Sequence, residues 1–563
     1  MPAALYGTDR PTPADNLSAN NLSADNLPVK TLSANNLSAN NLSANNLPAD
    51  NLPAEALAKG ANEMPPDVAK TVRFLHQAQQ QVAQAQRPKV ASLTFPIRSI
   101  EPWSVLSILG RLDQRHFYYD SPQQWALVGI GSVVGCSAAG SERFAQAQAF
   151  TQAWKSQFIH AETSSKADLP GRFFCSATFF DAPTQRPSSL TTDGSAPDAL
   201  AQDGFTQDTF AQDAFAPDAF APDSFEPVYI FVPQVQVMTL EEGSNITFNT
   251  LVEPATQSTD AQIYQIAQSI HAQLQQINES AAFGAAKQAS RKVVSKDVAS
   301  FESAVTGALA QIKAGQMHKV VLADVMDVEA QQAIDVVRSL QTLRQNHPDC
   351  TVFSVGNGKG QSFIGASPER LLSINKGQLT TDALAGSASR GKTSETDTEI
   401  AQSLINSKKE RYEHQVVVEF IVSQLRSLGL EPNYTTDPQL LQLLHIQHLH
   451  TPITASLNTE DAVSPLKVLA KLHPTPAVAG LPIDAACELI KQQETFERGL
   501  YAAPVGWIDT KGNSEFIVGI RSALIDGCKA RLYAGAGIVA GSKPEKELAE
   551  ITLKLQTLLN ALV

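Results

Sequence analysis

The stretch YAGAGIVAGSKPEKELAEITLKLQTLLNALV, residues 533–563, is the one from which we interpret the rest of the chain. Gly535, Gly537 and Gly541 interrupt a short strand end, because glycine lets the backbone turn sharply and expose N–H groups. Pro544 then stands where the first turn of a helix is expected. Apolar residues about 100° apart predict one buried stripe on this helix. The stripe consists of Leu548, Ile551, Leu555, Leu558 and Leu559.

A polar stripe borders the apolar one on the same predicted helix. Glu547, Glu550 and Lys554 recur at i, i+3 and i+7 beside the buried face. Two carboxylates from one helical turn suit Mg²⁺, which prefers hard oxygen ligands and shares them with an anionic substrate. Lys554, one turn further on, is placed to hold a substrate carboxylate. The spacing also fits a solvated helix edge with a Glu–Lys pair at i, i+4, so this stretch alone leaves both interpretations open.

Composition limits the class of protein. The 563 residues are enough for more than one domain, and the 43% hydrophobic content is typical of a globular protein. A net charge of −13 argues against a nucleic-acid partner held through phosphate contacts. The five cysteines form no CxxC pair, which indicates reduced thiols in a cytoplasmic protein rather than a zinc site or a disulfide framework. We find no secretory signal and no apolar run long enough to cross a membrane.

Two five-residue repeats interrupt the chain. Residues 1–60 carry NLSAN units, and we expect disorder there because one leucine in five cannot offset the ordering entropy. A second repeat, resembling FAQDA or FAPDA, predicts a disordered surface insertion over residues 193–227. Its seven aspartates supply about half of the net charge. The remaining sequence divides into an N-terminal part, 61–290, and a C-terminal part, 291–563.

The coarse pattern of the two parts differs. The N-terminal part predicts mostly strands, with a hairpin over 116–134 around a Ser-Pro turn and one strand over 228–238. The C-terminal part predicts a long helix over 396–428 and one strand over 515–525.

Three polar residues of the C-terminal part lie at positions where the pattern of helices and strands alone does not call for a polar side chain. Lys319 opens the apolar strand HKVVLADV, where exposure at a strand end is the simplest explanation. Glu369 follows Ser-Pro, where capping of a helix would be ordinary. Arg521 lies within the predicted strand EFIVGIRSALI, where an unpaired guanidinium would be costly.

Three further residues complete a set that contains an acid, a base, metal ligands and anion binders. Glu410 and Glu413 lie one turn apart in KKERYEHQ, directly before an apolar run. His448 lies in IQHLHT, where a core histidine bonded to the backbone is the usual interpretation.

Nine motifs occur in order along the C-terminal part. They are KVVLA at 319–323, FIGASPERLL at 363–372, ALAGSASRG at 383–391, ERYEH at 410–414, QHL at 447–449, LHPTPAVAG at 472–480, GWID at 506–509, IRSA at 520–523 and YAGAGIVAGS at 533–542. Together they resemble the chorismate-binding enzymes, and most closely the isochorismate synthases of menaquinone, phylloquinone and siderophore pathways. The resemblance is dense from about 297 to 563, diffuse from about 90 to 290 and absent from the repeats.

The resemblance implies a fold and a reaction. The fold would be α+β, with two packed antiparallel sheets flanked by helices, forming one interwoven domain with the site in a cleft between the sheets. In the reaction, water attacks C2 of chorismate while the C4 hydroxyl leaves, with Mg²⁺ bound. The family places the general base at Lys319 and the general acid at Glu369.

The resemblance also implies a set of ligands. Glu413 and Glu550 would hold Mg²⁺, with Glu410 and Glu547 acting directly or through water. The substrate-binding residues would be Gly386 and Ser387 along the ring, His448 at its border, and Arg521, Lys554 and backbone N–H groups at Gly535, Ala536 and Gly537 around the carboxylates.

Two positions separate this chain from ammonia-using relatives. Anthranilate synthases and aminodeoxychorismate synthases both have glutamine where this chain has Lys319. Aminodeoxychorismate synthases also have a nucleophilic lysine where this chain has Ala385. Water is therefore the expected nucleophile, and we expect a monomer without a glutamine amidotransferase partner. Asp324 departs from the arginine that relatives commonly have nearby.

Two other functions remain as alternatives. A salicylate synthase shares the base and the acid and then eliminates pyruvate, so product analysis separates it from an isochorismate synthase. A non-catalytic scaffold that recruits partners through its repeats would be indicated by loss of Lys319, Glu369 or the glutamates, all of which are present.

Overall fold

The computed structural model describes 11 segments of the chain. They are residues 66–111, 113–123, 125–161, 170–182, 225–241, 243–254, 258–279, 291–295, 298–444, 446–457 and 463–562. The expected disorder of residues 1–60 lies outside the described residues, and so does that of the insertion up to residue 224.

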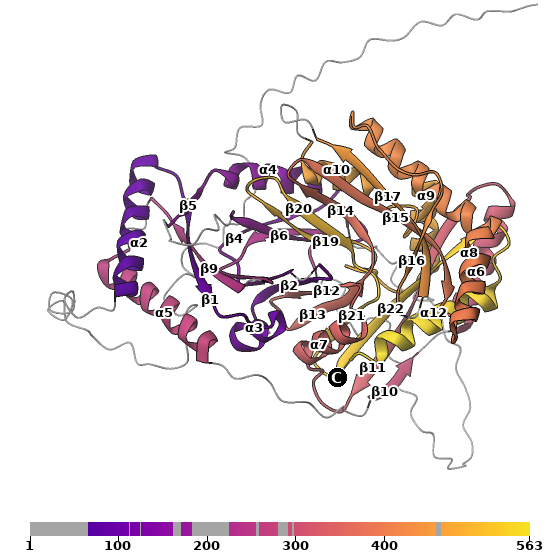
Figure 1. The fold of residues 1–563 in the computed structure, drawn as a ribbon, viewed down its shortest axis with the longest axis horizontal. Coiled ribbons are helices and arrows are strands. Elements are labelled where there is room, and N and C mark those ends of the chain that lie inside the picture. The colour runs from indigo at the N-terminus through magenta and orange to yellow at the C-terminus, as the bar shows by residue number, and fades with distance from the viewer. Residues whose placement is uncertain are drawn as a thin grey trace, which may run out of the picture.

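Two large sheets make up the centre of the molecule (Figure 1). In spatial order the larger sheet contains β10 (Arg291–Ser295), β11 (Lys319–Ala330), β22 (Lys529–Val539), β21 (Ser522–Asp526), β13 (Gln361–Ser367), β12 (Thr351–Asn357), β2 (Arg115–Ser121), β3 (Trp125–Ile130), β8 (Val235–Leu240), β9 (Gly243–Val252), β1 (Lys89–Ile97) and β5 (Phe158–His160), with β18 (Gly480–Leu481) beside β11. The smaller sheet contains β16 (Gln439–Gln442), β17 (Ile446–Ser456), β15 (Gln378–Ser389), β14 (Arg370–Asn375), β20 (Ser514–Val518), β19 (Pro504–Asp509), β6 (Arg172–Ala177), β7 (Val228–Val232) and β4 (Val134–Ala138). Each sheet therefore takes strands from both halves of the chain.

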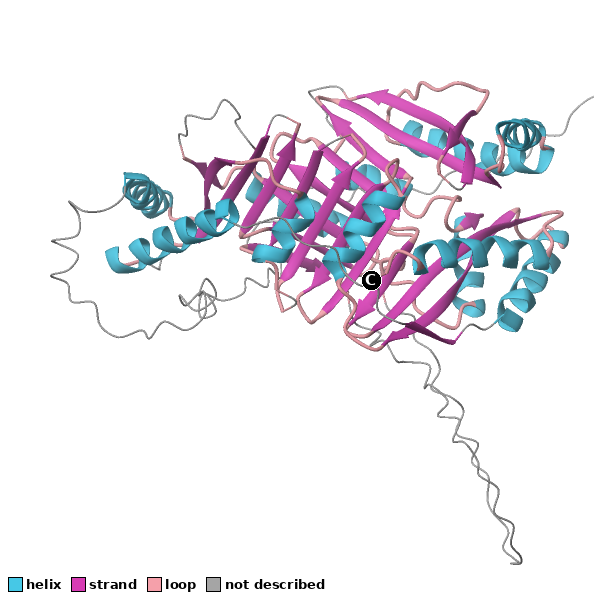
Figure 2. Cartoon of the chain, turned by 60° about the horizontal axis from the view of Figure 1, so that its bottom comes forward, coloured by secondary structure: helices cyan, strands magenta, loops and turns pink. Residues whose placement is uncertain are grey.

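Helices cover the outside of the sheets (Figures 1 and 2). They are α2 (Pro66–Ala85), α3 (Pro102–Leu109), α4 (Arg143–Lys155), α5 (Asp260–Glu279), α6 (Val298–Lys313), α7 (Val336–Asn346), α8 (Ser394–Asn406), α9 (Lys408–Ser427), α10 (Pro465–Leu472), α11 (Ile483–Gln493) and α12 (Pro544–Leu559). At one end of the molecule α6 and α12 pack beside β11 and β22, and α9 packs on β15, while α2 and α5 pair at the opposite end.

An aromatic layer fills the space between the two sheets. Phe117 of β2 stacks on Phe174 of β6, with ring centroids 4.5 Å apart. The hydroxyl of Tyr119 donates a 2.8 Å hydrogen bond to Glu515 of β20, in the other sheet. Stacked aromatic pairs contribute beyond their buried area, so this layer fixes how the sheets face one another.

The chain passes between the sheets twice at one place. It leaves the larger sheet between β13 and β14, through Pro368 and Glu369, and returns between β20 and β21, through Gly519–Arg521. Backbone hydrogen bonds of 3.1 Å join the two passages, from Ala366 N to Arg521 O and from Val518 N to Glu369 O. Arg521 has φ of 51°, in the left-handed region that most side chains avoid.

The predicted α+β fold with two packed sheets is confirmed, since strands of the two sheets are antiparallel throughout except for the pair β1 and β5. The C-terminal helix is confirmed as α12. The strand expected over 515–525 is wrong, because the chain changes sheet within it. The single strand expected over 228–238 is also wrong, because the structure has two strands there, β7 and β8.

Two further predictions need correction. The helix expected over 396–428 is two helices, because Ser407 leaves the helical conformation and its side chain accepts the N–H of Glu410, which caps α9. Gly535 and Gly537 do not interrupt a strand, since β22 continues through both as far as Val539.

The last residues of the acidic insertion are ordered against the core, contrary to the expectation for 193–227. Phe225 is partly buried against the hydrophobic core. Glu226 accepts hydrogen bonds from Arg115, whose guanidinium lies 3.6 Å from the ring centroid of Tyr229.

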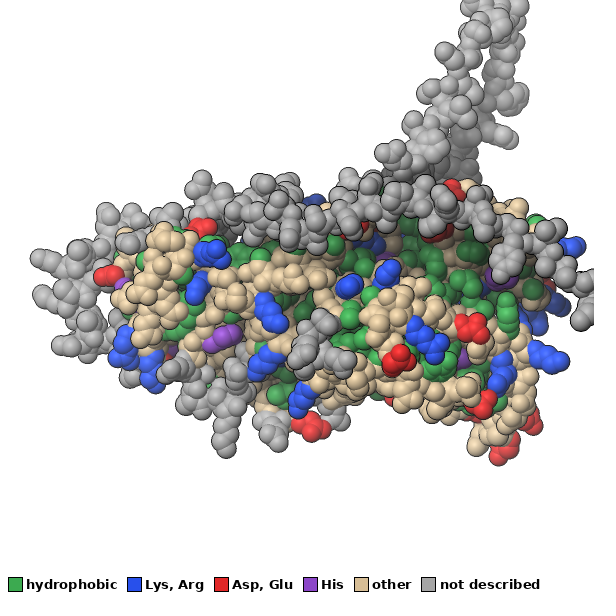
Figure 3. All heavy atoms as spheres, turned by 90° about the horizontal axis from the view of Figure 1, so that it is seen from above, with side chains coloured by type: hydrophobic (Ala, Val, Ile, Leu, Met, Phe, Trp, Pro, Cys, Tyr) green, Lys and Arg blue, Asp and Glu red, His purple; other side chains and the backbone are tan. Residues whose placement is uncertain are grey.

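Charges on the surface are mixed in sign. The face in Figure 3 carries Lys and Arg side chains interspersed with Asp and Glu among hydrophobic and other atoms. Among the described residues, no helix is long and apolar enough to cross a membrane.

Two nested deletions should separate the insertion from its ordered end. Removing residues 193–222 is expected to leave the Tm nearly unchanged, whereas removing 193–226 should lower it by about 1–3 °C, because Arg115 then loses its partly buried partner. Thermal unfolding of both variants and of a 1–60 deletion measures this. Equal losses in both insertion variants would contradict the boundary at Phe225.

Candidate functional site

An open cavity of about 940 Å³, including the solvent space at its mouth, lies where the two passages between the sheets meet α9 and α12. Twelve of the fourteen residues predicted from the sequence line it: Glu369, Gly386, Ser387, Glu410, Glu413, His448, Arg521, Gly535, Gly537, Glu547, Glu550 and Lys554. Lys319 and Ala536 are the two predicted residues that do not line it.

Glu369 and Arg521 enter the cavity from the two adjacent passages. Glu369 is 5% exposed and caps no helix, contrary to the simpler interpretation. Burial raises its pKa to about 8; Asp382 adds to the shift, while the cations Lys319 and Arg521 oppose it. A carboxyl with this pKa is mostly protonated at neutral pH, so Glu369 can donate a proton to a leaving group.

Lys319 is not the exposed strand end that its position suggested. It is 1% exposed, and its Nζ lies 2.8 Å from Glu413 Oε1. Among the described atoms, Lys319 Nζ has no partner with hydrogen-bond geometry. Its N–H groups can therefore still donate hydrogen bonds to a ligand. The pair joins the first residue of β11 to the cavity wall formed by α9.

Each of the four glutamates that line the cavity from the two helices has a lysine partner. Besides the pair of Lys319 with Glu413, Lys554 lies 2.7 Å from Glu550, as the i, i+4 interpretation predicted. Lys409 lies 3.5 Å from Glu410 and 3.4 Å from Glu547. The solvated helix edge is nevertheless wrong for Glu547, which is only 5% exposed.

Strand alternation separates Ala536 from the glycines beside it. Val321 and Ala323 direct their N–H groups to the far side of β11. Their partners Gly537 and Gly535 must then direct their own N–H groups away from β11 as well. Ala536, in between, then directs its N–H group toward β11, and its side chain lies in the hydrophobic core, so we expect binding groups from the two glycines and none from Ala536.

Two glycines leave room for the carboxylates. A Cβ at Gly537 would lie 2.6 Å from Glu413 Oε1 and 3.3 Å from the Cε of Lys319. Gly386 has φ of 78°, and a Cβ there would lie 3.3 Å from Glu410 Oε2. Beside it, the N–H of Ser387 donates to Glu410 Oε2 at 3.3 Å.

His448 is a buried neutral histidine that orients Arg521. The guanidinium of Arg521 lies 3.1 Å from His448 Nε2 and can only donate, so Nε2 accepts and the ring proton sits on Nδ1. Nδ1 bonds to the backbone of Gly386. Burial, with Arg521 and Lys554 nearby, holds the pKa of His448 well below its usual value.

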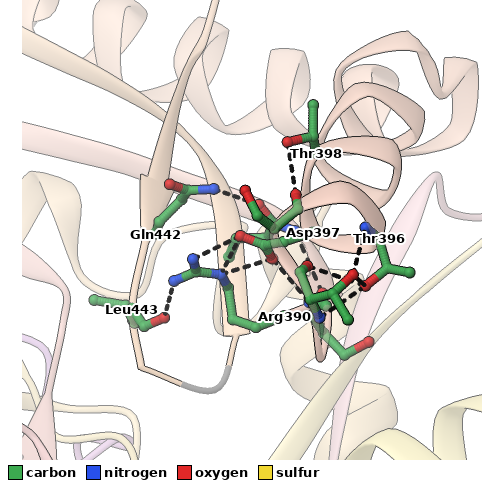
Figure 4. A network of polar contacts seen from close by, with 11 residues as sticks. Arg390, Thr396, Asp397, Thr398, Gln442 and Leu443 are labelled. Carbon is green, nitrogen blue, oxygen red and sulfur yellow. Dashed lines mark hydrogen bonds and ion pairs between the residues drawn. The ribbon is translucent and has the colours of Figure 1, made fainter.

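A polar network fixes the end of β15 that carries Gly386 and Ser387 (Figure 4). Arg390 donates to both carboxylate oxygens of Asp397 at 2.6–3.1 Å, and to the carbonyl of Leu443 at 2.7 Å. The guanidinium of Arg390 and the N–H of Gly391 lower the pKa of Asp397 to about 2.

Lys409 and Tyr501 are among the lining residues that sequence reasoning missed. Lys409 was passed over in KKERYEHQ, although it precedes the predicted ligand Glu410. Tyr501 lies beside Gly535, where a Cβ would come within 2.7 Å of its hydroxyl, and no periodic pattern marked it. Asp324 accepts the N–H of Val325 at 2.8 Å and does not line the cavity.

The four glutamates fit a divalent cation by chemistry, since carboxylates are the ligands that Mg²⁺ prefers, and Gly537 leaves the space beside Glu413 free. In the described part of the chain, however, no group of three or more His, Cys, Asp or Glu side chains is arranged to hold a metal ion. The glutamates instead lie against lysines: Glu413 and Glu550 each have one of their own, and Glu410 and Glu547 share Lys409.

A model of the chorismate binding enzyme family matches residues 74–196 and 189–563 of the chain. The salicylate biosynthesis isochorismate synthase of Pseudomonas aeruginosa is 41% identical over 267 residues, which are 46% of this chain and 54% of that protein. Isochorismate synthase MenF of Bacillus subtilis is 40% identical over 259 residues, again 46% and 54% of the two chains. The matched stretch thus spans about half the length of these curated relatives.

Solved structures show the same fold. The structure of MenF, the menaquinone-specific isochorismate synthase from Escherichia coli, matches with a TM-score of 0.64 at 23% identity, covering 86% of this chain and 100% of that one. Anthranilate synthase component I from Streptococcus pneumoniae matches with a TM-score of 0.55 at 19% identity, covering 78% and 92%.

The raised pKa of Glu369 predicts a pH-dependent stability. Between the usual carboxyl pKa and about 8 the folded state binds more protons than the unfolded state, so the free energy of unfolding should fall as pH rises through this window. Glu369→Gln removes the effect, and its advantage over wild type should grow from about pH 5 to 8 by up to a few kcal/mol and then level off. Urea unfolding at several pH values measures this, with the exposed Glu419→Gln as control. Parallel curves for wild type and Glu369→Gln would contradict it.

Proposed function

We propose that the protein converts chorismate to isochorismate, and the premise is that the chain belongs to the chorismate-binding enzyme family. One observation carries the proposal: a buried carboxyl with a pKa of about 8, Glu369, lines a cavity whose wall residue Glu413 pairs with the buried lysine Lys319 behind it. This combination suits replacement of one hydroxyl by another, because the reaction needs a base for water and an acid for the departing oxygen. Two relatives named as isochorismate synthases support the same substrate.

Arg521, Lys554 and the N–H groups of Gly535 and Gly537 are proposed to hold the carboxylates of chorismate. Charge-assisted hydrogen bonds from a guanidinium are strong and directional, and His448 fixes the orientation of Arg521. Gly386 and Ser387, held by the network around Arg390, would line the ring.

Lys319 and Glu369 are proposed to move the protons. As the base, Lys319 takes a proton from the water that attacks C2, and the C2–O bond forms. The ring double bonds shift and the C4–O bond breaks, while Glu369 protonates the leaving hydroxyl so that it departs as water. The reaction is an isomerisation, since one water enters and one leaves.

Glu413 and Glu550, with Glu410 and Glu547, are proposed to hold Mg²⁺. The ion would supply positive charge that neutralises and orients the ring carboxylate of the substrate. The role of the helices α9 and α12 is to present these four carboxylates to the same wall of the cavity.

The nucleophile is proposed to be water rather than ammonia, because a lysine occupies position 319 and an alanine occupies position 385. We accordingly propose a cytoplasmic monomer that needs no glutamine amidotransferase. Incubation with chorismate and MgCl₂, followed by chromatography of the products, tests the function. Isochorismate supports it, salicylate with pyruvate would indicate the salicylate synthase alternative, and unconsumed chorismate would contradict both.

Replacing the base should abolish most of the turnover. Lys319→Gln keeps most of the side-chain length but cannot accept the proton of water, so kcat should fall by about 10²–10⁴-fold. Chorismate binding should survive, since Arg521 and Lys554 are unchanged. Isochorismate formation at saturating chorismate and Mg²⁺ measures this, and a variant within a few-fold of wild type would remove Lys319 from the mechanism.

Replacing a metal ligand should raise the metal requirement. Glu413→Gln and Glu550→Gln each remove a negative ligand while keeping shape, so the Mg²⁺ concentration for half-maximal activity should rise at least about tenfold. Glu545→Gln, in the first turn of α12 and exposed, is the matched control. If either ligand variant shows the same Mg²⁺ dependence as this control, that glutamate does not bind the ion.

A further inference from the structure

Lys409 is the one lysine of the cavity wall that the proposed reaction leaves without a role. It is the second residue of α9, and its ammonium reaches across to α12, 3.5 Å from Glu410 Oε1 and 3.4 Å from Glu547 Oε1. Within the described part of the chain these two carboxylates are its only acceptors. The preceding residue, Lys408, is exposed.

The contacts of Lys409 occupy the groups that a divalent cation would need. Mg²⁺ binds oxygen at about 2.0–2.1 Å and demands near-octahedral geometry, so it cannot share these oxygens with an ammonium that bridges them. The side chain of Glu547 is 6% exposed and that of Glu410 is 18% exposed, so water screens the contacts poorly. Lys409 therefore supplies to these two carboxylates the positive charge that a metal ion would otherwise bring.

We propose that Lys409 is an internal counter-ion that competes with the divalent cation for Glu410 and Glu547, so that the metal binds weakly until substrate is present. The inference rests on the proposed function for the identity of the metal site. A substrate with two carboxylates brings negative charge that offsets the positive charge of Lys409. Bound substrate therefore strengthens metal binding, and the metal strengthens substrate binding by the same factor.

Metal titration without substrate tests the competition. Calorimetric titration of MgCl₂ into the full chain, at constant ionic strength, should show binding at least about tenfold tighter for Lys409→Met than for wild type, because a repelling cation is gone. Lys409→Arg keeps the charge and should stay within a few-fold of wild type. Lys408→Met removes the same charge from an exposed neighbour and should leave the affinity unchanged.

Several results would overturn the proposal. It fails if Lys409→Met binds Mg²⁺ no more tightly than wild type, and it fails if neither protein binds the ion. An equal gain in Lys408→Met would indicate a general effect of net charge, and an equal gain in Lys409→Arg would indicate an effect of shape. The Tm of each variant without metal checks folding, and Lys409→Gln replaces the methionine variant if that one is unfolded.

The outcome can be separated from that of the proposed function. Metal affinity is measured without chorismate and without turnover, so tighter binding in Lys409→Met would stand even if the wild type made no isochorismate. Conversely, isochorismate formation by the wild type together with unchanged Mg²⁺ affinity in Lys409→Met would refute only the competition.

Discussion

The paired passage of the chain between the two sheets is the constraint on which the rest of the structure depends. Strands β13 and β21 are neighbours in one sheet, and their continuations β14 and β20 are neighbours in the other, so both chains must cross at the same level. Close approach is possible because a Cβ at Gly365 would lie 2.8 Å from the carbonyl oxygen of Arg521. The passages then carry Glu369 and Arg521 to adjacent points of the cavity wall, without any helix to place them.

This placement explains the electrostatics of the site. A carboxyl held in a buried backbone passage cannot turn toward water, so burial dominates and its pKa rises despite two cations nearby. Lys319 is buried to a similar extent, but it lies at the end of a strand that faces α9 and meets Glu413. The site thus favours a protonated acid on one wall of the cavity and holds an ion-paired amine behind another wall, at Glu413, which is the separation that acid–base chemistry needs.

The parts of the fold that periodicity governs could be predicted from the sequence. The apolar stripe of α12 and the hairpin of β2 and β3 follow from side-chain spacing, and the structure contains both. The break at Arg521 could not be predicted in this way, because apolar residues continue on both sides of it while the strand changes sheet. The break at Ser407 could not be predicted for the same reason. Ser407 caps α9 after the end of α8, while the helical spacing of apolar residues continues on both sides of it.

The candidate site was predictable where a motif named its residues, and where helical spacing placed Glu547, Glu550 and Lys554 beside a buried face. Twelve of fourteen predicted residues line the cavity, because the motifs lie at strand ends and helix starts that the fold brings together. The N–H group of Ala536 was included with those of its glycine neighbours, yet strand alternation turns it toward β11 and away from the cavity. Lys409 was missed because a lysine at the start of a helix normally lies in solvent, and only the approach of α12 places Glu547 opposite it.

The lysines also explain how the site can fold before any ion binds. Four carboxylates on two facing helices would repel one another and push α9 and α12 apart if left uncompensated. Pairing each of them with an ammonium removes most of that repulsion, and the bridge from Lys409 to Glu547 holds the two helices together. The arrangement favours a scaffold that is rigid without metal over one that metal assembles. The cavity can then keep the acid, the base and the anion-binding groups in position while the ion and the substrate exchange.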